Sequence, residues 1–509
     1  MANFIYTNFP ADFKNKFLGN DNAMAEFWSG IPKDDPRITK LKTDHRNYKE
    51  TCIPIVLHGD GVPCTNSHSL DTISFESLLA KRSTGELSSS VDSIFFCTGL
   101  FTQTMTTEAF GGKEKSKREM WKPLVHSFRS AYYGIMPSHD SDGAAFVDGT
   151  DNFKLKDQPV AGKYKLVAWV LKGDMDFNVN HFEIPGHWGS NTPCPTCPCT
   201  RDDNSPMAWN HFGDGALWKG MTFTDIDLYR IYCRSYTPPK QVPLIFTPLD
   251  ENGLGMHLKS SYKDTLHVAD LGVSKHIGGS VLHELCYDIL PGSAKENMDQ
   301  IWNEIQQLYG AQQTSSQFSY LSLASFVTGT VDSPHANYLL LGGKGADIRH
   351  LIPILNSIWR AHMRPGNNHD RMVERVLQRM TSFYECINYT DANGVHPFHL
   401  PAHIAAKLVK DIDRLLTFYS HLSRESMLNN VMRWYIVPKH HYLWHLANEA
   451  TDLNPRMSWC YANEDFVGKI SIIGMSTRHG QAAAFRSHAL ARKYILGLFL
   501  RMYHSLSAS

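Results

Sequence analysis

Four short apolar runs in the first third of the chain predict buried strands, because β-branched and aromatic residues dominate them. They cover residues 53–58, 72–79, 93–100 and 164–174. The first strand is expected to stop at the Gly-Asp-Gly sequence around Asp60, and the last ends in Gly-Asp at Asp174. Acids at strand ends are typical of ligand and metal sites on α/β sheets. The alternative is that each aspartate only caps the turn that follows its strand.

Apolar residues recur at helical spacing in most of the remaining chain, especially after residue 264. Helices are predicted over residues 120–133, 264–290, 296–309, 346–362, 400–423 and 481–503. We interpret their apolar stripes as helical core. Residues 113–118 are expected to form a charged loop, and residues 1–50 a polar lead-in without a domain of its own.

The composition is that of an ordinary globular protein, with 509 residues, 42% hydrophobic and 20% charged. Its 50 basic and 50 acidic residues cancel, so nucleic-acid binding would need a local basic surface. We expect no secretory signal in the first twenty residues. The apolar runs fall far short of the roughly 20 residues of a membrane helix.

Three of the ten cysteines lie close together, in Cys194-Pro-Thr-Cys197-Pro-Cys199. Cys-x-x-Cys is half of a tetrahedral zinc site, and the expected lack of export favours metal over disulfides. The candidates for the other half are His181, His187, Cys199 and His211. Reduced structural thiols and a redox pair are the alternatives. The histidine-rich turn with His440, His441 and His445 is interpreted as structural.

The remaining candidate chemistry is acidic. The candidates are Asp60, Asp174 and Glu464. A further candidate is the pair Asp264 and His267, which helical spacing places on one side of a turn. Two aspartates and a glutamate on an α/β sheet are typical of nucleases and transposases that use two metal ions. Such hard oxygen ligands suit Mg²⁺ or Mn²⁺.

The order of these motifs resembles the catalytic core of CACTA (En/Spm-like) transposases, of the RNase H-like DDE class. Residues 264–273 are similar to that family's Asp-x-Met-His signature. Residues 438–446 and 459–469 are similar to its Pro-x-x-His-x-x-x-His and Tyr-Trp-x-x-x-Phe-Glu-Arg-x-x-Gly ending. The similarity spans roughly residues 50–500 and extends to transposon-derived proteins abundant in dinoflagellate genomes.

The resemblance implies an α/β fold: an RNase H-like catalytic core with a zinc-knuckle-like insertion and a large all-α insertion. The implied segments are a lead-in (1–50), the first part of the core (51–177), a Cys/His-rich insertion (178–240), a helical region (241–436) and the C-terminal part of the core (437–509).

The resemblance also implies roles for single residues. Asp60, Asp174 and Glu464 would hold catalytic Mg²⁺ or Mn²⁺, with Asp176, Glu449 and Asp465 as substitutes for the second and third. Asp264 and His267 would be accessory residues. His267 would contact a scissile phosphate or a flipped base; alternatively it is a packing histidine hydrogen-bonded to Asp264.

The implied function is DNA strand cleavage and transfer by a two-metal DDE mechanism, with structural Zn²⁺. The implied partner is DNA, as transposon ends and target, in a homo-oligomer without membrane association and in the nucleus. The alternative is a domesticated, catalytically inactive transposon-derived protein that binds DNA or protein. A third reading is an unrelated zinc-binding scaffold without an acidic cluster.

Overall fold

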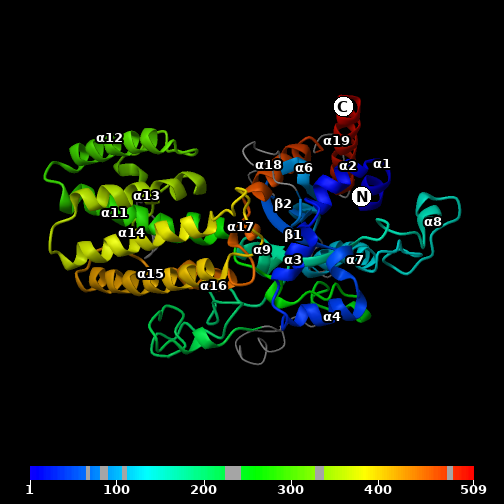
Figure 1. Cartoon of the computed structure of the whole chain (residues 1–509), viewed down its shortest axis with the longest axis horizontal. Coiled ribbons are helices and arrows are strands. Elements are labelled where there is room, and N and C mark those ends of the chain that lie inside the picture. Colours follow the sequence, from blue (N-terminus) through cyan, green and yellow to red (C-terminus); the bar gives the residue numbers. More distant parts are fainter. Residues whose placement is uncertain are drawn as a thin grey trace. The chain divides into compact units, whose positions relative to one another are not determined.

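The computed structural model describes residues 1–64, 69–80, 90–105, 112–223, 242–326, 338–477 and 485–508. The chain divides into two compact units (Figure 1). Unit 1 comprises Met1–His187, Phe223–Tyr262 and Cys460–Ser509, and unit 2 comprises Trp188–Thr222 and Lys263–Trp459. The expected segment boundary at residue 437 thus falls inside unit 2. Residues 224–240 of the expected insertion and 481–484 of the expected last helix lie outside the described residues.

Unit 1 contains a four-stranded mixed sheet, which makes the chain a mixed α/β protein. The strands are β1 (Cys52–Pro63), β2 (Ser69–Ser77), β3 (Ile94–Phe101) and β4 (Lys165–Lys172), in the order β3-β2-β1-β4. β1 is antiparallel to β2, β2 is antiparallel to β3, and β1 is parallel to β4. A parallel bridge between Leu171 and Ser261 continues the sheet beyond β4.

Strand β1 does not stop where the sequence predicted. It continues through Asp60 to Pro63, because β2 keeps pairing with it along this whole length. The parallel pairing with β4 ends earlier, at His58 and Lys172. Asp60 therefore lies inside β1 but just beyond its pairing with β4.

Helices cover both faces of this sheet. The α-helices of unit 1 are α1 (Ala2–Asn8), α2 (Pro10–Phe13), α3 (Ala23–Gly30), α4 (Pro36–Asp44), α5 (Tyr48–Thr51), α6 (Ser90–Ser93), α7 (Gly112–Tyr133), α8 (Asp151–Leu155), α9 (Met175–Asn180), α18 (Tyr461–Met475) and α19 (Arg486–Ala508). Successive strand residues point to opposite faces. Phe75 packs against Phe128 of α7, whereas Glu76 bonds Asn463 of α18, so α7 and α18 lie on opposite faces.

Two expectations for unit 1 are corrected. The charged residues 113–118 belong to α7, since Lys, Glu and Arg favour helices when they stay exposed. The lead-in is helical and contributes to the core: Phe9, Phe13 and Phe17 recur every four residues, and each is at most 2% exposed. Helical spacing puts these rings on one stripe, which is buried in unit 1.

Unit 2 is helical. Its helices are α11 (Ser274–Glu284), α12 (Ala294–Gln312), α13 (Gly345–His362), α14 (Asn368–Ile387), α15 (Ala402–Leu428), α16 (Pro438–Glu449) and α17 (Pro455–Ser458), and π-helical turns over Leu266–Val273 and Leu285–Ile289 flank α11. Helices α13, α14 and α15 pack side by side (Figure 1). No helix in the described part of the chain is both long enough and apolar enough to cross a membrane.

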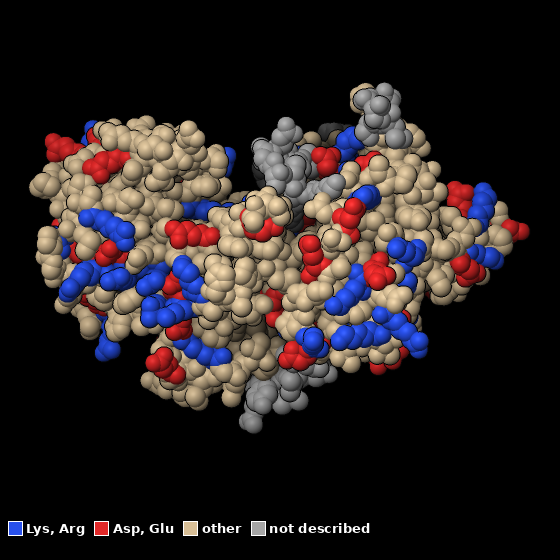
Figure 2. Space-filling view, in the orientation of Figure 1, with Lys and Arg blue, Asp and Glu red and all other residues tan. Residues whose placement is uncertain are grey.

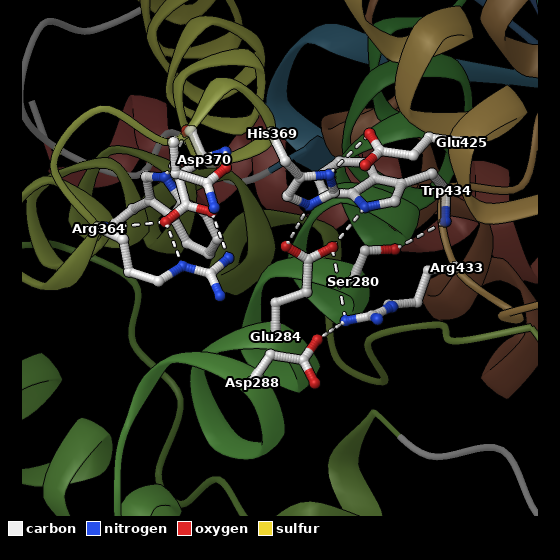
Figure 3. A network of polar contacts seen from close by, with 11 residues as sticks. Ser280, Glu284, Asp288, Arg364, His369, Asp370, Glu425, Arg433 and Trp434 are labelled. Atoms are coloured by element: carbon white, nitrogen blue, oxygen red, sulfur yellow. Dashed lines mark hydrogen bonds and ion pairs between the residues drawn. The ribbon is translucent and has the colours of Figure 1, made fainter. Parts of the chain in front are cut away.

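A polar network joins α11, α14 and α15 (Figure 3). His369 lies between two acids, with Nε2 2.9 Å from Glu284 and Nδ1 2.9 Å from Glu425. Trp434 donates from Nε1 to Glu284 at 2.7 Å. Because Glu284 is 3% exposed, these donors compensate a carboxylate that would otherwise be costly to bury.

Candidate functional site

Two segments of unit 2 bring four metal-binding side chains together. Cys194 and Cys197 lie in residues 188–222, a stretch with little regular structure beyond a 3₁₀ turn at Leu217–Gly220. His441 and His445 are one turn apart on α16, so they share a face of that helix. One ligand atom from each residue lies within 4.8 Å of the others, and all four residues are buried.

The donor set fits a tetrahedral metal. Sγ of Cys197 lies 3.2 Å from Nε2 of His441, which lies 3.1 Å from Nε2 of His445. Two thiolates and two imidazoles are the ligands of closed structural zinc sites. Because the four ligand atoms are buried, water does not reach their lone pairs, and one cation would satisfy all four atoms. The group could therefore bind a metal such as zinc.

The surroundings hold these ligands in place. Nδ1 of His441 lies 2.9 Å from the carbonyl oxygen of Trp209, the contact that directs the other ring nitrogen of a histidine toward a metal. Burial lowers the pKa of His445 to about 4, so its ring is neutral at pH 7. Lys263 donates from Nζ to Thr196 at 2.6 Å and to Glu449 at 3.3 Å, which ties the cysteine loop to α16.

The structure brings together only part of the predicted ligand set. Cys194 and Cys197 belong to the group, but His181, His187, Cys199 and His211 do not. His181 instead pairs with Asp71 at 3.2 Å, and His211 is exposed. His441 and His445, which the sequence indicated as structural, complete the group. Their spacing of four residues on a helix was the available signal.

His440 keeps its structural interpretation. It is fully buried, its ring centroid lies 4.3 Å from that of Tyr419 with the rings tilted, and its Nδ1 accepts from the backbone N–H of Val437 at 3.1 Å. Burial lowers its pKa to about 3. On α16, His441 thus belongs to the four-residue group and its neighbour His440 does not.

Asp60 lies in β1 of unit 1, and Asp174 follows the end of the parallel strand β4. Each follows the last β1–β4 pair, His58 and Lys172, by two residues. Both acids therefore lie at the same end of the β1–β4 pair, here called the sheet edge. A Cβ on Gly173 would lie 2.9 Å from the carbonyl oxygen of Gly59, so the two chains approach closely here.

Each aspartate uses one oxygen for the backbone. Oδ1 of Asp60 accepts from the N–H of Gly61, and Oδ1 of Asp174 accepts from the N–H of Phe177, both at 2.7 Å. Asp174 thereby caps α9, as the alternative interpretation predicted. Its Oδ2 has no hydrogen-bond partner among the described residues, and both aspartates are half-buried. Capping and metal binding are thus compatible at Asp174.

Glu464 comes to the sheet on α18, which packs against β1 and β2. The residue before it, Asn463, donates from Nδ2 to Glu76 at 3.3 Å. Glu76 also pairs with Lys172 at 2.9 Å, and these two side chains are 4% and 1% exposed. This buried network joins α18 to β2 and β4. Its member Asn463 precedes Glu464 in the sequence, and its member Lys172 lies two residues before Asp174.

The substitutes for these acids have other surroundings. Asp176 is exposed in the first turn of α9. Asp465 accepts from Ser90 at 2.5 Å and from Lys469 at 2.7 Å. Glu449 lies in unit 2, where it accepts from the backbone N–H of Lys263 at 2.7 Å, and burial raises its pKa.

Asp264 and His267 form the predicted pair, with Oδ2 2.5 Å from Nδ1. Asp264 also accepts from the backbone N–H groups of Leu266 and His267 at 3.1 Å. Burial would raise the pKa of Asp264, but these contacts outweigh it and lower the pKa. Both residues belong to unit 2, and the pairing agrees with either reading of His267.

Comparison with known proteins adds no family: no protein-family model and no curated protein matches the chain.

Proposed function

We propose that unit 1 is an RNase H-like catalytic core that cleaves and joins DNA strands by a two-metal DDE mechanism. The observation that carries the proposal is the β1–β4 register, which sets Asp60 and Asp174 at one sheet edge. The antiparallel β1-β2-β3 meander, followed by α7 and the parallel strand β4, supports this fold. Helix α18 brings the third acid, Glu464, to the same sheet.

The three acids suit the proposed chemistry. When bound, two Mg²⁺ or Mn²⁺ ions would activate the attacking water or 3′-hydroxyl and stabilise the leaving oxygen. The protein's share is to position hard oxygen ligands. Backbone hydrogen bonds orient Asp60 and Asp174, and the buried Glu76–Lys172 pair anchors the helix of Glu464. In this proposal DNA is the partner, the nucleus is the place of action, and the metal group of unit 2 is structural.

Nicking and joining of supercoiled plasmid DNA in Mn²⁺ tests the proposal. Asp174→Asn is the informative variant, because asparagine caps a helix as well as aspartate does but lacks the charge. Asp60→Asn likewise keeps the contact to Gly61. We expect both to lose more than the roughly 10–100-fold that outer-shell substitutions cost.

Asp148→Asn is the matched control. Oδ1 of Asp148 accepts from the N–H of the following glycine at 2.8 Å, as in Asp60, but Asp148 is exposed on a loop. This variant should nick DNA like the wild type. Equal activity in Asp60→Asn, Asp174→Asn and wild type would refute the proposal. A folded protein without any activity would favour the alternative, an inactive DNA- or protein-binding module.

A further inference from the structure

Basic side chains gather on two adjacent helices of unit 2, although the whole chain is neutral. Figure 2 shows Lys and Arg over the helices that Figure 1 labels α14 and α15. On α15 the exposed residues His403, Lys407, Lys410, Arg414, His421 and Arg424 recur at intervals of three, four or seven. This spacing places them on one face of the helix.

The acids of these helices do not neutralise that face. Asp370 is buried and paired with Arg364. Asp411 is buried and paired with Arg379 and Lys407. Three further acids are half-buried and each has a basic partner. The pairs are Glu374 with Arg360, Asp413 with Lys219, and Glu425 with His369. Glu385 is the one exposed acid among the described residues of α14 and α15.

On α14 and α15, five exposed Lys and Arg residues have no ion-pair partner in the described part of the chain. They are Arg371 and Arg375 on α14 and Lys410, Arg414 and Arg424 on α15, here called the basic face. Arg371 and Arg375 are one turn apart on the solvent side of α14. Between Lys410 and Arg424 the basic face on α15 is about 21 Å long, at 1.5 Å per residue.

We propose that the basic face binds the phosphate backbone of double-stranded DNA. Rows of guanidinium and ammonium groups on a rigid helix match the regular negative charge of a duplex, one per ~1.7 Å of its axis. A single strand would call for stacking on exposed aromatic rings. The aromatic residues of α14 and α15 are buried or half-buried. The inference rests on the proposed function in that it names the same substrate.

The test is the affinity for a labelled duplex of mixed sequence, measured by fluorescence anisotropy across NaCl concentrations without added divalent metal. The triple variant Lys410→Ala, Arg414→Ala and Arg424→Ala removes three charges from the basic face. Each phosphate contact contributes ~0.9 to the slope of log affinity against log salt. We therefore expect the slope to fall by up to ~2.7 and the affinity at 0.1 M NaCl to fall on the order of 10²-fold.

The control removes the same charge elsewhere: Lys33→Ala, Lys42→Ala and Lys295→Ala, three exposed lysines outside α14 and α15. It should bind DNA with nearly the wild-type slope. Equal losses in both triple variants, or no loss in the first, would overturn the inference. Binding to phosphatidylserine vesicles in preference to the duplex, lost in the first triple variant, would also overturn it by making the partner a membrane.

This experiment separates the inference from the proposed catalytic function. The binding assay contains no divalent metal, so it reports the basic face without strand cleavage. If plasmid nicking fails but salt-dependent binding to the basic face is observed, the inference holds and the catalytic proposal fails.

Discussion

Replacing His441 with alanine is expected to remove zinc from the protein, whereas His440→Ala is expected to leave it bound. The two histidines are adjacent on α16 and 1% and 0% exposed, so both changes cost packing. Only the first removes a metal-facing nitrogen, 3.2 Å from Sγ of Cys197. The pair of variants therefore separates a ligand from a structural neighbour.

The size of the effect follows from the ligand count. Structural zinc binding is worth about 10–16 kcal/mol at pH 7, so one of four ligands contributes about 3 kcal/mol, on the order of 10²-fold in affinity. Zinc content by mass spectrometry and competition with a chromophoric chelator measure this loss. Residues 188–222, which have little regular structure to hold them, should become sensitive to protease in His441→Ala.

Two results would refute the metal centre. One is a His441→Ala protein that binds zinc with wild-type affinity. The other is an equal loss of zinc in His440→Ala, which would mean that general packing around α16 decides the metal content.

Three further predictions concern the remaining parts of the molecule. Glu76→Gln leaves Lys172 buried without its anion and should lower the free energy of unfolding in urea by about 3–5 kcal/mol. The double variant Glu76→Leu/Lys172→Met should lose much less of this free energy, and an equal loss would contradict the buried ion pair. Burial lowers the pKa of His369, but Glu284 and Glu425 outweigh it and raise the pKa to about 9. The stabilisation from its charge is thus fully present below pH ~6.5, the unfolded pKa, and lost as pH rises through 9; His369→Gln should flatten this alkaline loss in thermal melts, and an unchanged pH profile would count against it. In Gly59→Ala the new Cβ would overlap the ring of Phe177, which follows the cap Asp174, so DNA nicking should fall while zinc content stays; wild-type nicking would contradict this.

The strands could be predicted from sequence because their apolar runs are local signals. The predicted runs at 53–58, 72–79, 93–100 and 164–174 correspond to β1 to β4. The parallel β1–β4 pairing, which ends two residues before Asp60 and Asp174, links residues more than a hundred positions apart, and the order of motifs could only suggest it. The helical lead-in was missed because its polar average hid the four-residue spacing of Phe9, Phe13 and Phe17.

The candidate metal centre shows the same limit. Cys197 and His441 are separated by 244 positions, and nothing local to either residue indicates the other. Nearer candidates such as His181 were favoured for that reason, although its partner is Asp71 in the sheet. Reading Cys-x-x-Cys together with His-x-x-x-His as two halves of one site would have found the set that the structure brings together.

The most direct test of the proposed catalytic centre is anomalous diffraction from crystals grown with Mn²⁺. The account predicts two manganese peaks ~3.5–4 Å apart at the sheet edge, coordinated by carboxylate oxygens of Asp60, Asp174 and Glu464. Crystals with an ordered sheet and a bound zinc ion, but no manganese between these three carboxylates, would contradict it.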